Sequence, residues 1–172
     1  MQRILIVGSS GAGKTTLARQ LAEVLGIQVI HLDTLFWKPG WVESEKEEWQ
    51  ATVRGAIQGG SWIMDGNFSG TLPERLEACD TVIFLDFPRT VCLWRILKRV
   101  TKYYGGTRPD LPAGCPERFD LNFMAWVWNF PARSRRNVLA LLERHRDTKK
   151  VVRLRTRREV DEFIAQQLAA QE

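Results

Sequence analysis

Eight residues near the N-terminus have the types and the order needed to hold a triphosphate. They read Gly-Ser-Ser-Gly-Ala-Gly-Lys-Thr, which is a glycine, four residues and then Gly-Lys-Thr. Glycines let backbone N–H groups approach phosphate oxygens closely, and a following helix turns its positive dipole end toward them. Lys14 offers an ammonium to the β- and γ-phosphates, and the Thr15 hydroxyl can ligate Mg²⁺. We therefore expect ATP and magnesium to bind at Gly8, Ser9, Ser10, Gly11, Ala12, Gly13, Lys14, Thr15 and Thr16.

The elements on either side of this loop are those that a phosphate loop requires. Residues 3–7 form a β-branched apolar run, typical of a strand buried on both faces. Residues 14–25 carry apolar side chains at helical spacing, and Gly26 supplies a stop. A plain glycine turn is the alternative, and the strand before it and the helix after it favour the phosphate loop.

The rest of the chain repeats this alternation of strand and helix. Further strands are predicted at residues 28–32, 62–64, 81–85 and 151–154, with helices between them such as 44–57 and 90–103. This pattern predicts an α/β fold with a three-layer, doubly wound parallel sheet, in one domain over residues 1–172. Ser44 with Glu47 predicts a capping box. Asp120 or a neighbour is predicted to cap the aromatic helix that contains Trp126 and Trp128, and Pro131 is predicted to kink or restart that helix.

Three aspartates come directly after predicted strands, where ligands collect in an open parallel sheet. Asp33, Asp65 and Asp86 could hold magnesium or orient an acceptor hydroxyl, and a turn or cap role is the alternative for each. The family resemblance given below selects Asp33 and Asp65, together with Thr15, as the expected metal residues. Asp33 is also our choice for contacting the acceptor.

Residues 105–116 are dense in Gly and Pro, which predicts a mobile lid, an insert of about residues 105–119. Each guanidinium group near the lid could bind phosphoryl oxygens through two hydrogen bonds and stabilise the charge of the transition state. We expect these to act with Lys14 and Asp33 in catalysis: Arg95, Arg99, Arg108 and Arg118. A solvated basic face is the alternative for these and for Arg133, Arg135 and Arg136.

Composition narrows the class of partner. The net charge of +5 and the pI near 9.4 come from 25 basic against 20 acidic residues, with the excess between Arg89 and Arg158. The spread of these arginines favours phosphate handling over a nucleic-acid surface. The chain has 3 cysteines without a Cys-x-x-Cys pair and no long apolar run, so we expect reduced thiols and a soluble, cytoplasmic protein.

The motifs together resemble those of adenylate-kinase-like P-loop kinases. The resemblance is greatest to the bacterial DNA topology modulation group of the FlaR type, and it runs over nearly the whole chain. It is carried by the phosphate loop, by His-Leu-Asp-Thr-Leu-Phe-Trp from His31, by Trp-Ile-Met-Asp-Gly-Asn from Trp62, and by residues 82–99 and 115–119. The resemblance implies a nucleoside-monophosphate-kinase fold with a lid, magnesium-organising carboxylates at Asp33 and Asp65, and Arg155 and Thr156 near the adenine.

One segment departs from the pattern of that family. The adenylate kinases follow their Asp-Gly with Phe-Pro-Arg, whereas here Asp65-Gly66 continues with Asn67-Phe68-Ser69. The missing arginine weakens the inference that AMP is the acceptor, unless Arg75 takes its place. Trp37 and Trp41, which follow Asp33, could form an aromatic platform for an acceptor ring or belong to the core.

Two functions follow from these patterns. The favoured one is a kinase that transfers the γ-phosphoryl group of Mg-ATP to a small-molecule or nucleotide acceptor. The alternative is an ATP-dependent nucleic-acid-binding protein that affects DNA topology, although no DNA-reading module is recognisable.

Overall fold

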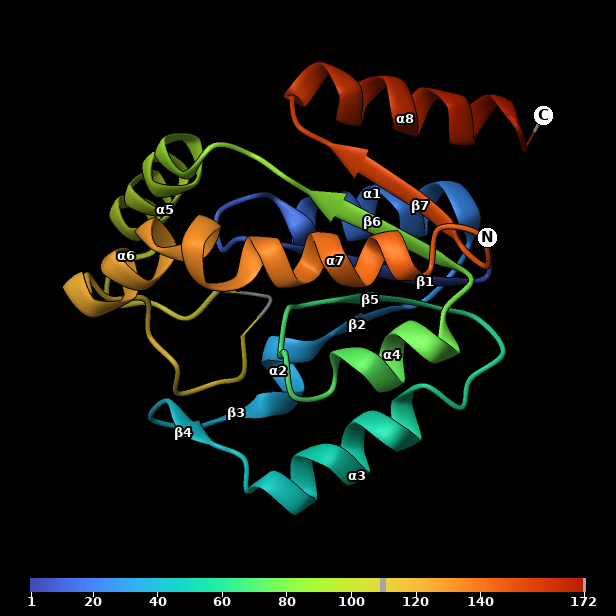
Figure 1. Cartoon of the computed structure of the whole chain (residues 1–172). Coiled ribbons are helices and arrows are strands. Elements are labelled where there is room, and N and C mark those ends of the chain that lie inside the picture. Colours follow the sequence, from blue (N-terminus) through green and yellow to red (C-terminus); the bar gives the residue numbers. More distant parts are fainter. Residues whose placement is uncertain (109–110, 172) are drawn as a thin grey trace.

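A five-stranded parallel sheet forms the centre of the molecule, and the order of its strands is β2-β5-β1-β6-β7 (Figure 1). The computed structural model describes residues 1–108 and 111–171. The bounds of these strands are β1 Arg3–Gly8, β2 Val29–His31, β5 Trp62–Asp65, β6 Thr81–Leu85 and β7 Lys150–Leu154. β1 lies in the middle of the sheet, so the phosphate loop that follows it leaves from the central strand.

Helices cover both faces of the sheet. Ile4 and Ile6 of β1 belong to one buried cluster, and Leu5 and Val7 belong to the other, as alternation along a strand requires. α1, α5 and α8 pack on the first face, and α3, α4 and α7 pack on the second. Their bounds, with the remaining helices, are α1 Lys14–Leu25, α2 Leu32–Phe36, α3 Lys46–Ala56, α4 Leu72–Ala78, α5 Arg89–Tyr103, α6 Leu121–Trp128, η1 Pro131–Arg135, α7 Arg136–Arg144 and α8 Arg157–Ala169.

The layered parallel sheet confirms the predicted fold class, and two local predictions need correction. The second strand ends at His31, and Leu32 already begins α2, so Asp33 lies on a short helix. The capping box at Ser44 is wrong: α3 begins at Lys46, and the Ser44 hydroxyl instead donates to the carbonyl of Phe36, at 2.7 Å. Ser44 is held there because it closes a short hairpin, β3 Trp37–Lys38 with β4 Val42–Glu43.

The predictions for the aromatic helix are confirmed. The Asp120 side chain accepts a hydrogen bond from the backbone N–H of Phe123, at 3.0 Å, as an N-cap does. Pro131 opens a five-residue π-helical turn, η1, between α6 and α7.

The three cysteines are free and buried. Within the described residues, no helix combines the length and the apolar composition that crossing a membrane requires.

Asp86 joins three elements instead of serving a site. Its backbone N–H pairs with the carbonyl of Leu154, at 2.8 Å. Arg135 of η1 donates to its two carboxylate oxygens at 2.7 and 2.9 Å, and Arg153 of β7 donates at 2.9 and 2.5 Å. Burial raises the pKa of the Asp86 carboxyl, but these hydrogen bonds outweigh it, and the pKa lies below its ordinary value. The carboxylate therefore fastens η1 to the sheet.

Asp86→Asn tests this clamp. We expect it to lower the free energy of unfolding by about 2 kcal/mol near neutral pH, because two arginines lose their anion. A carboxyl whose folded pKa is lowered stabilises above the unfolded value of about 3.9, and this is lost as the pH falls through the folded pKa. Urea unfolding should thus show a difference in the free energy of unfolding between wild type and Asp86→Asn that disappears at acid pH. Asp161→Asn, in an exposed pair with Arg157, is the control, and a difference that stays constant with pH contradicts the assignment.

Candidate active site

The phosphate loop leaves β1 at Gly8 and enters α1 at Lys14. Gly11 and Gly13 have positive φ angles of 78° and 99°, a conformation that side chains rarely adopt. A Cβ on Gly11 would lie 2.3 Å from the carbonyl oxygen of Cys92 in α5. The loop is therefore both curved and pressed against α5, and glycine is required for each.

Asn67 fixes the start of the loop. Its side-chain amide accepts from the Gly8 backbone N–H at 2.9 Å and donates to the Gly8 carbonyl at 2.7 Å. Lys14 donates to the same carbonyl at 3.0 Å and to that of Ser9 at 3.1 Å. Because Asn67 satisfies both polar groups of Gly8, the backbone is held without help from a ligand.

The turn that carries Asn67 is held in turn by Arg75. This side chain is 0% exposed, and it donates to the carbonyls of Gly66 at 3.0 Å, Phe68 at 2.9 Å, and Thr71 at 3.3 Å, and also to that of Asn67. Burial lowers the pKa of Arg75 to about 9, which still leaves it a cation at neutral pH. The idea that Arg75 replaces the missing family arginine is wrong, since it is enclosed within its own turn.

Thr15 and Asp65 come together beside the loop. The Thr15 hydroxyl donates to Asp65 Oδ2 at 2.8 Å, and His31 Nδ1 donates to Oδ1 of the same carboxylate at 2.7 Å. Strand pairing explains the contact, because His31 and Asp65 are register partners in β2 and β5. His31 thus orients the carboxylate.

This pair fits a magnesium ion. A hydroxyl and one carboxylate are hard oxygen donors, and Mg²⁺ commonly takes only one or two protein ligands beside phosphates and water. A cluster of three or more His, Cys, Asp or Glu side chains would suit another metal, and the described part of the chain contains no such cluster. Asp33 lies on α2, is exposed and lines the cavity described below, and its metal role stays a prediction.

The charge of Lys14 is balanced by nearby carboxylates. Burial lowers the pKa of the Lys14 ammonium, while the charges of Asp33 and Asp65 raise it in part. Both aspartates therefore lie within electrostatic reach of the lysine, as the sequence predicts.

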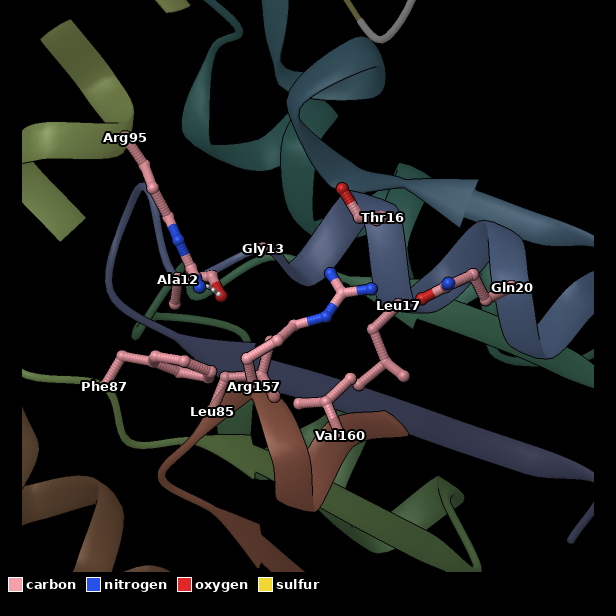
Figure 2. Close-up of a pocket in the computed structure, with 10 residues that line it drawn as sticks. All are labelled: Ala12, Gly13, Thr16, Leu17, Gln20, Leu85, Phe87, Arg95, Arg157 and Val160. Carbon is pink, nitrogen blue, oxygen red and sulfur yellow. Dashed lines mark hydrogen bonds between the residues drawn. The ribbon is translucent and has the colours of Figure 1, made fainter. Parts of the chain in front are cut away.

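Arg95 braces the loop from α5. Its Nη1 donates to the carbonyl of Ala12 at 2.9 Å, and its guanidinium lies 4.5 Å from the centroid of the Phe87 ring. Figure 2 shows Arg95 reaching Ala12 beside a small pocket, with Arg157 extending from α8 toward α1. The pocket lies on the α1 and α8 side of the loop, so Arg95 supports this side of the loop.

Glu117 collects two of the predicted catalytic arginines. Arg99 donates to its Oε1 at 3.2 and 3.0 Å, and Arg108 Nε lies 2.7 Å from its Oε2. The Glu117 side chain is 5% exposed, so this is a buried cluster between α5 and the lid. Arg118 is more loosely placed, with 63% of its side chain exposed and a contact of 3.9 Å to Asp120.

A cavity of about 1070 Å³ opens from the loop toward the lid and α6. Lys14 and Ser10 lie at one end, and Asp33, Trp37 and Trp41 line one wall. The rings of Trp37 and Trp41 meet edge to face at 5.4 Å. Both tryptophans thus reach the space where an acceptor platform is predicted.

The lid loop and the β3–β4 hairpin meet above this cavity. The Gly40 N–H donates to the Gly114 carbonyl at 2.8 Å, and Trp41 Nε1 donates to the carbonyl of Pro116 at 3.0 Å. The Cys115 thiol also donates to the Lys38 carbonyl, at 3.3 Å. Of the predicted lid, residues 109–110 lie outside the described residues.

The predicted adenine contacts are occupied locally. The Thr156 hydroxyl accepts from the Glu159 N–H at 3.2 Å as the N-cap of α8, and the Arg155 N–H donates to the Glu159 carboxylate at 2.5 Å. Their contact with a base stays a prediction. The sequence reasoning missed Asn67 and Glu117; the signal for Asn67 was its place directly after Asp65-Gly66 at the end of β5.

The comparisons with known proteins agree with this geometry. A family described as an AAA domain matches residues 4–108, more than half of the chain. The chain belongs to the AAA domain family. The chain is 30% identical over 95 residues to a putative adenylate kinase of Pyrococcus furiosus, covering 51% of each chain. It is 32% identical over 105 residues to the adenylate kinase of Thermosipho melanesiensis, covering 59% of this chain and 48% of the relative.

The chain therefore spans about half the length of the curated relatives it matches. The predicted resemblance to adenylate-kinase-like P-loop kinases is confirmed at the level of family. The finer resemblance to the FlaR-type topology modulation group stays a prediction.

Two solved structures show the fold of the whole chain. Shikimate kinase from Acinetobacter baumannii, in complex with shikimate, superposes with a TM-score of 0.56 at 18% identity, covering 99% of this chain and 93% of the other. A gluconokinase from Sinorhizobium meliloti gives 0.53 at 16% identity, covering 98% and 90%. They confirm the predicted P-loop kinase fold.

Asn67→Ala tests the two hydrogen bonds by which Asn67 holds Gly8 at the start of the phosphate loop. We expect a loss of about 1 to 3 kcal/mol in the free energy of unfolding, because the buried amide and carbonyl of Gly8 lose a partner. Affinity for ATP should fall as well, since the loop must then be ordered by the nucleotide. Urea unfolding and calorimetry measure both. Asn129→Ala, at the exposed end of α6, is the matched control, and unchanged ATP affinity in Asn67→Ala would contradict this role.

Proposed function

We propose that this protein is a kinase, which binds Mg-ATP at the phosphate loop and transfers the γ-phosphoryl group to a small-molecule or nucleotide acceptor. The observation that carries this proposal is the cavity, which begins at Lys14 and continues past Asp33 to an aromatic wall. A phosphate site alone would serve any NTPase, whereas a cavity of about 1070 Å³ that includes the end of the phosphate loop and extends to the lid and α6 is large enough for a second reactant as well.

The residues divide the work by position. The amides of residues 8–15 and the ammonium of Lys14 bind phosphates, while Thr15 and Asp65 would hold a magnesium ion, which supplies charge neutralisation on the phosphate oxygens. Asp33, facing the cavity and within electrostatic reach of Lys14, orients the acceptor group. Arg99 and Arg108 are positioned by Glu117 near the same space.

The adenylate kinase, shikimate kinase and gluconokinase relatives support an acceptor of small size. The charge arrangement does not favour nucleic acid as the partner. Arg135 and Arg153 are neutralised by Asp86, and Arg99 and Arg108 are neutralised by Glu117. Many of the basic side chains are thus neutralised by ion pairs within the protein and do not form a positively charged surface.

Lys14→Ala separates ATP binding from folding. The ammonium is desolvated in the free protein, so its removal should not lower the free energy of unfolding. The phosphates lose their main cation, and we expect ATP affinity to fall at least about tenfold. Calorimetry with Mg-ATP and circular dichroism check the two outcomes. Lys46→Ala, exposed at the start of α3, is the control; equal ATP affinity in Lys14→Ala would sink the assignment.

An acceptor screen tests the kinase itself. The protein with Mg-ATP is given hydroxy acids, polyols, nucleosides and nucleoside monophosphates, and ADP formation is followed. At least one acceptor should raise ADP formation well above the rate with water alone, and Asp33→Asn should abolish that increase but not ATP binding. A screen in which every compound leaves the water rate unchanged counts against the kinase.

A further inference from the structure

One arginine in the cavity differs from its neighbours in having an aromatic partner and no carboxylate. The guanidinium carbon of Arg133 lies 4.1 Å from the centroid of the Trp126 ring. Trp126 in turn stacks on Phe123, with centroids 6.0 Å apart and planes inclined by 14°. All three side chains line the cavity, at the end formed by α6 and η1.

The π-helical turn places Arg133 over this ring. The backbone N–H groups of Ala132 and Arg133 both donate to the Asn129 carbonyl, at 3.1 and 3.0 Å. Asp86 anchors the same turn through Arg135. The base of the Arg133 side chain is therefore rigid, and stacking on Trp126 fixes the plane of the guanidinium while leaving its edge N–H groups available.

The ion pairs of the other arginines make this arrangement distinctive. Arg99 and Arg108 share Glu117, and Arg118 lies near Asp120. Across residues 1–108 and 111–171, no acidic side chain forms an ion pair with Arg133. Partial burial lowers the pKa of Arg133, which means that its charged form is disfavoured by desolvation. An anion beside the guanidinium would offset that cost.

We propose that Arg133 on Trp126 recognises an anionic group of the acceptor, a carboxylate or a phosphate, and so sets the substrate class of this kinase. The inference rests on the proposed function, because it assigns the far end of the same cavity. Ser134 and Asn137 line the cavity beside Arg133 and supply further polar groups for the anion. The acceptor is then a small anionic molecule, with the group to be phosphorylated directed toward Asp33 and Lys14.

Matched pairs of acceptors test the substrate class. Gluconate against glucitol offers a carboxylate, and glycerol 3-phosphate against glycerol offers a phosphate, with an uncharged hydroxyl group in place of the anion in each neutral partner. ADP formation is measured with each compound. Wild type should use the anionic member of at least one pair with a kcat/KM about tenfold or more above that of the neutral member. Equal use of both members in every pair that reacts overturns the proposal.

Arg133→Met removes the charge while keeping an apolar side chain over Trp126. The KM for the anionic acceptor should rise about 10- to 100-fold, with little change in the KM for ATP, and Arg133→Lys should recover part of the loss. Arg89→Met is the matched control, because Arg89 also stacks on a tryptophan of α6, 3.8 Å from the centroid of Trp128, but it lies outside the lining of the cavity. An unchanged acceptor KM in Arg133→Met refutes the role.

A binding measurement separates this inference from the kinase proposal. Calorimetric titration with gluconate and with glycerol 3-phosphate is carried out while a non-hydrolysable ATP analogue saturates the phosphate loop. Wild type and Arg89→Met should bind one of these anions at least about tenfold more tightly than Arg133→Met does. Such binding without any ADP formation would defeat the kinase and keep the anion site. Failure of wild type to bind either anion, or equal binding by Arg133→Met, would defeat the anion site.

Discussion

The phosphate loop depends on how the backbone of Gly8 is satisfied at the end of the central strand. On one side Gly8 still pairs with Leu85 of β6. On the other side β5 has already turned away, and the side-chain amide of Asn67 supplies the donor and the acceptor that a strand would have supplied. The turn bearing Asn67 passes so close to α2 that a Cβ on Gly66 would lie 2.8 Å from the Cβ of Leu32. The loop and the helix of Asp33 are thus parts of one packed unit.

The charges around the cavity follow a simple arrangement. Two buried carboxylates, Asp86 and Glu117, each hold two arginines, and each group joins elements that are distant in the sequence. Such ion-pair groups contribute more to positioning the backbone than to the free energy of unfolding. The reason is that the desolvation penalty of the buried ions offsets much of their Coulombic attraction. Arg133, which also lines the cavity and has no ion pair among the described residues, rests instead on the Trp126 ring. Net charge alone therefore says little about what this protein binds.

Local sequence was sufficient to predict what is encoded locally. The loop, α1, the parallel sheet, the cap at Asp120 and the turn at Pro131 each follow from short patterns with one physical meaning. The role of Asp86 was not predictable, because its partners Arg135 and Arg153 lie 49 and 67 residues away. The capping box predicted at Ser44 was wrong for the same reason. Its hydroxyl fits a capping pattern in the sequence, but in the structure it hydrogen-bonds to Phe36 at the base of the β3–β4 hairpin.

The buried cation at Arg75 has a consequence for the order of folding. α4 has 7 residues, too few to persist alone in water, so it forms only as it docks on the sheet. The guanidinium can leave water only when the carbonyls of the Gly66–Phe68 turn surround it. The contact of Asn67 with Gly8 depends on this same turn, so it requires the packed turn. A chain in which α4 has not docked therefore lacks the ordered phosphate loop that nucleotide binding uses.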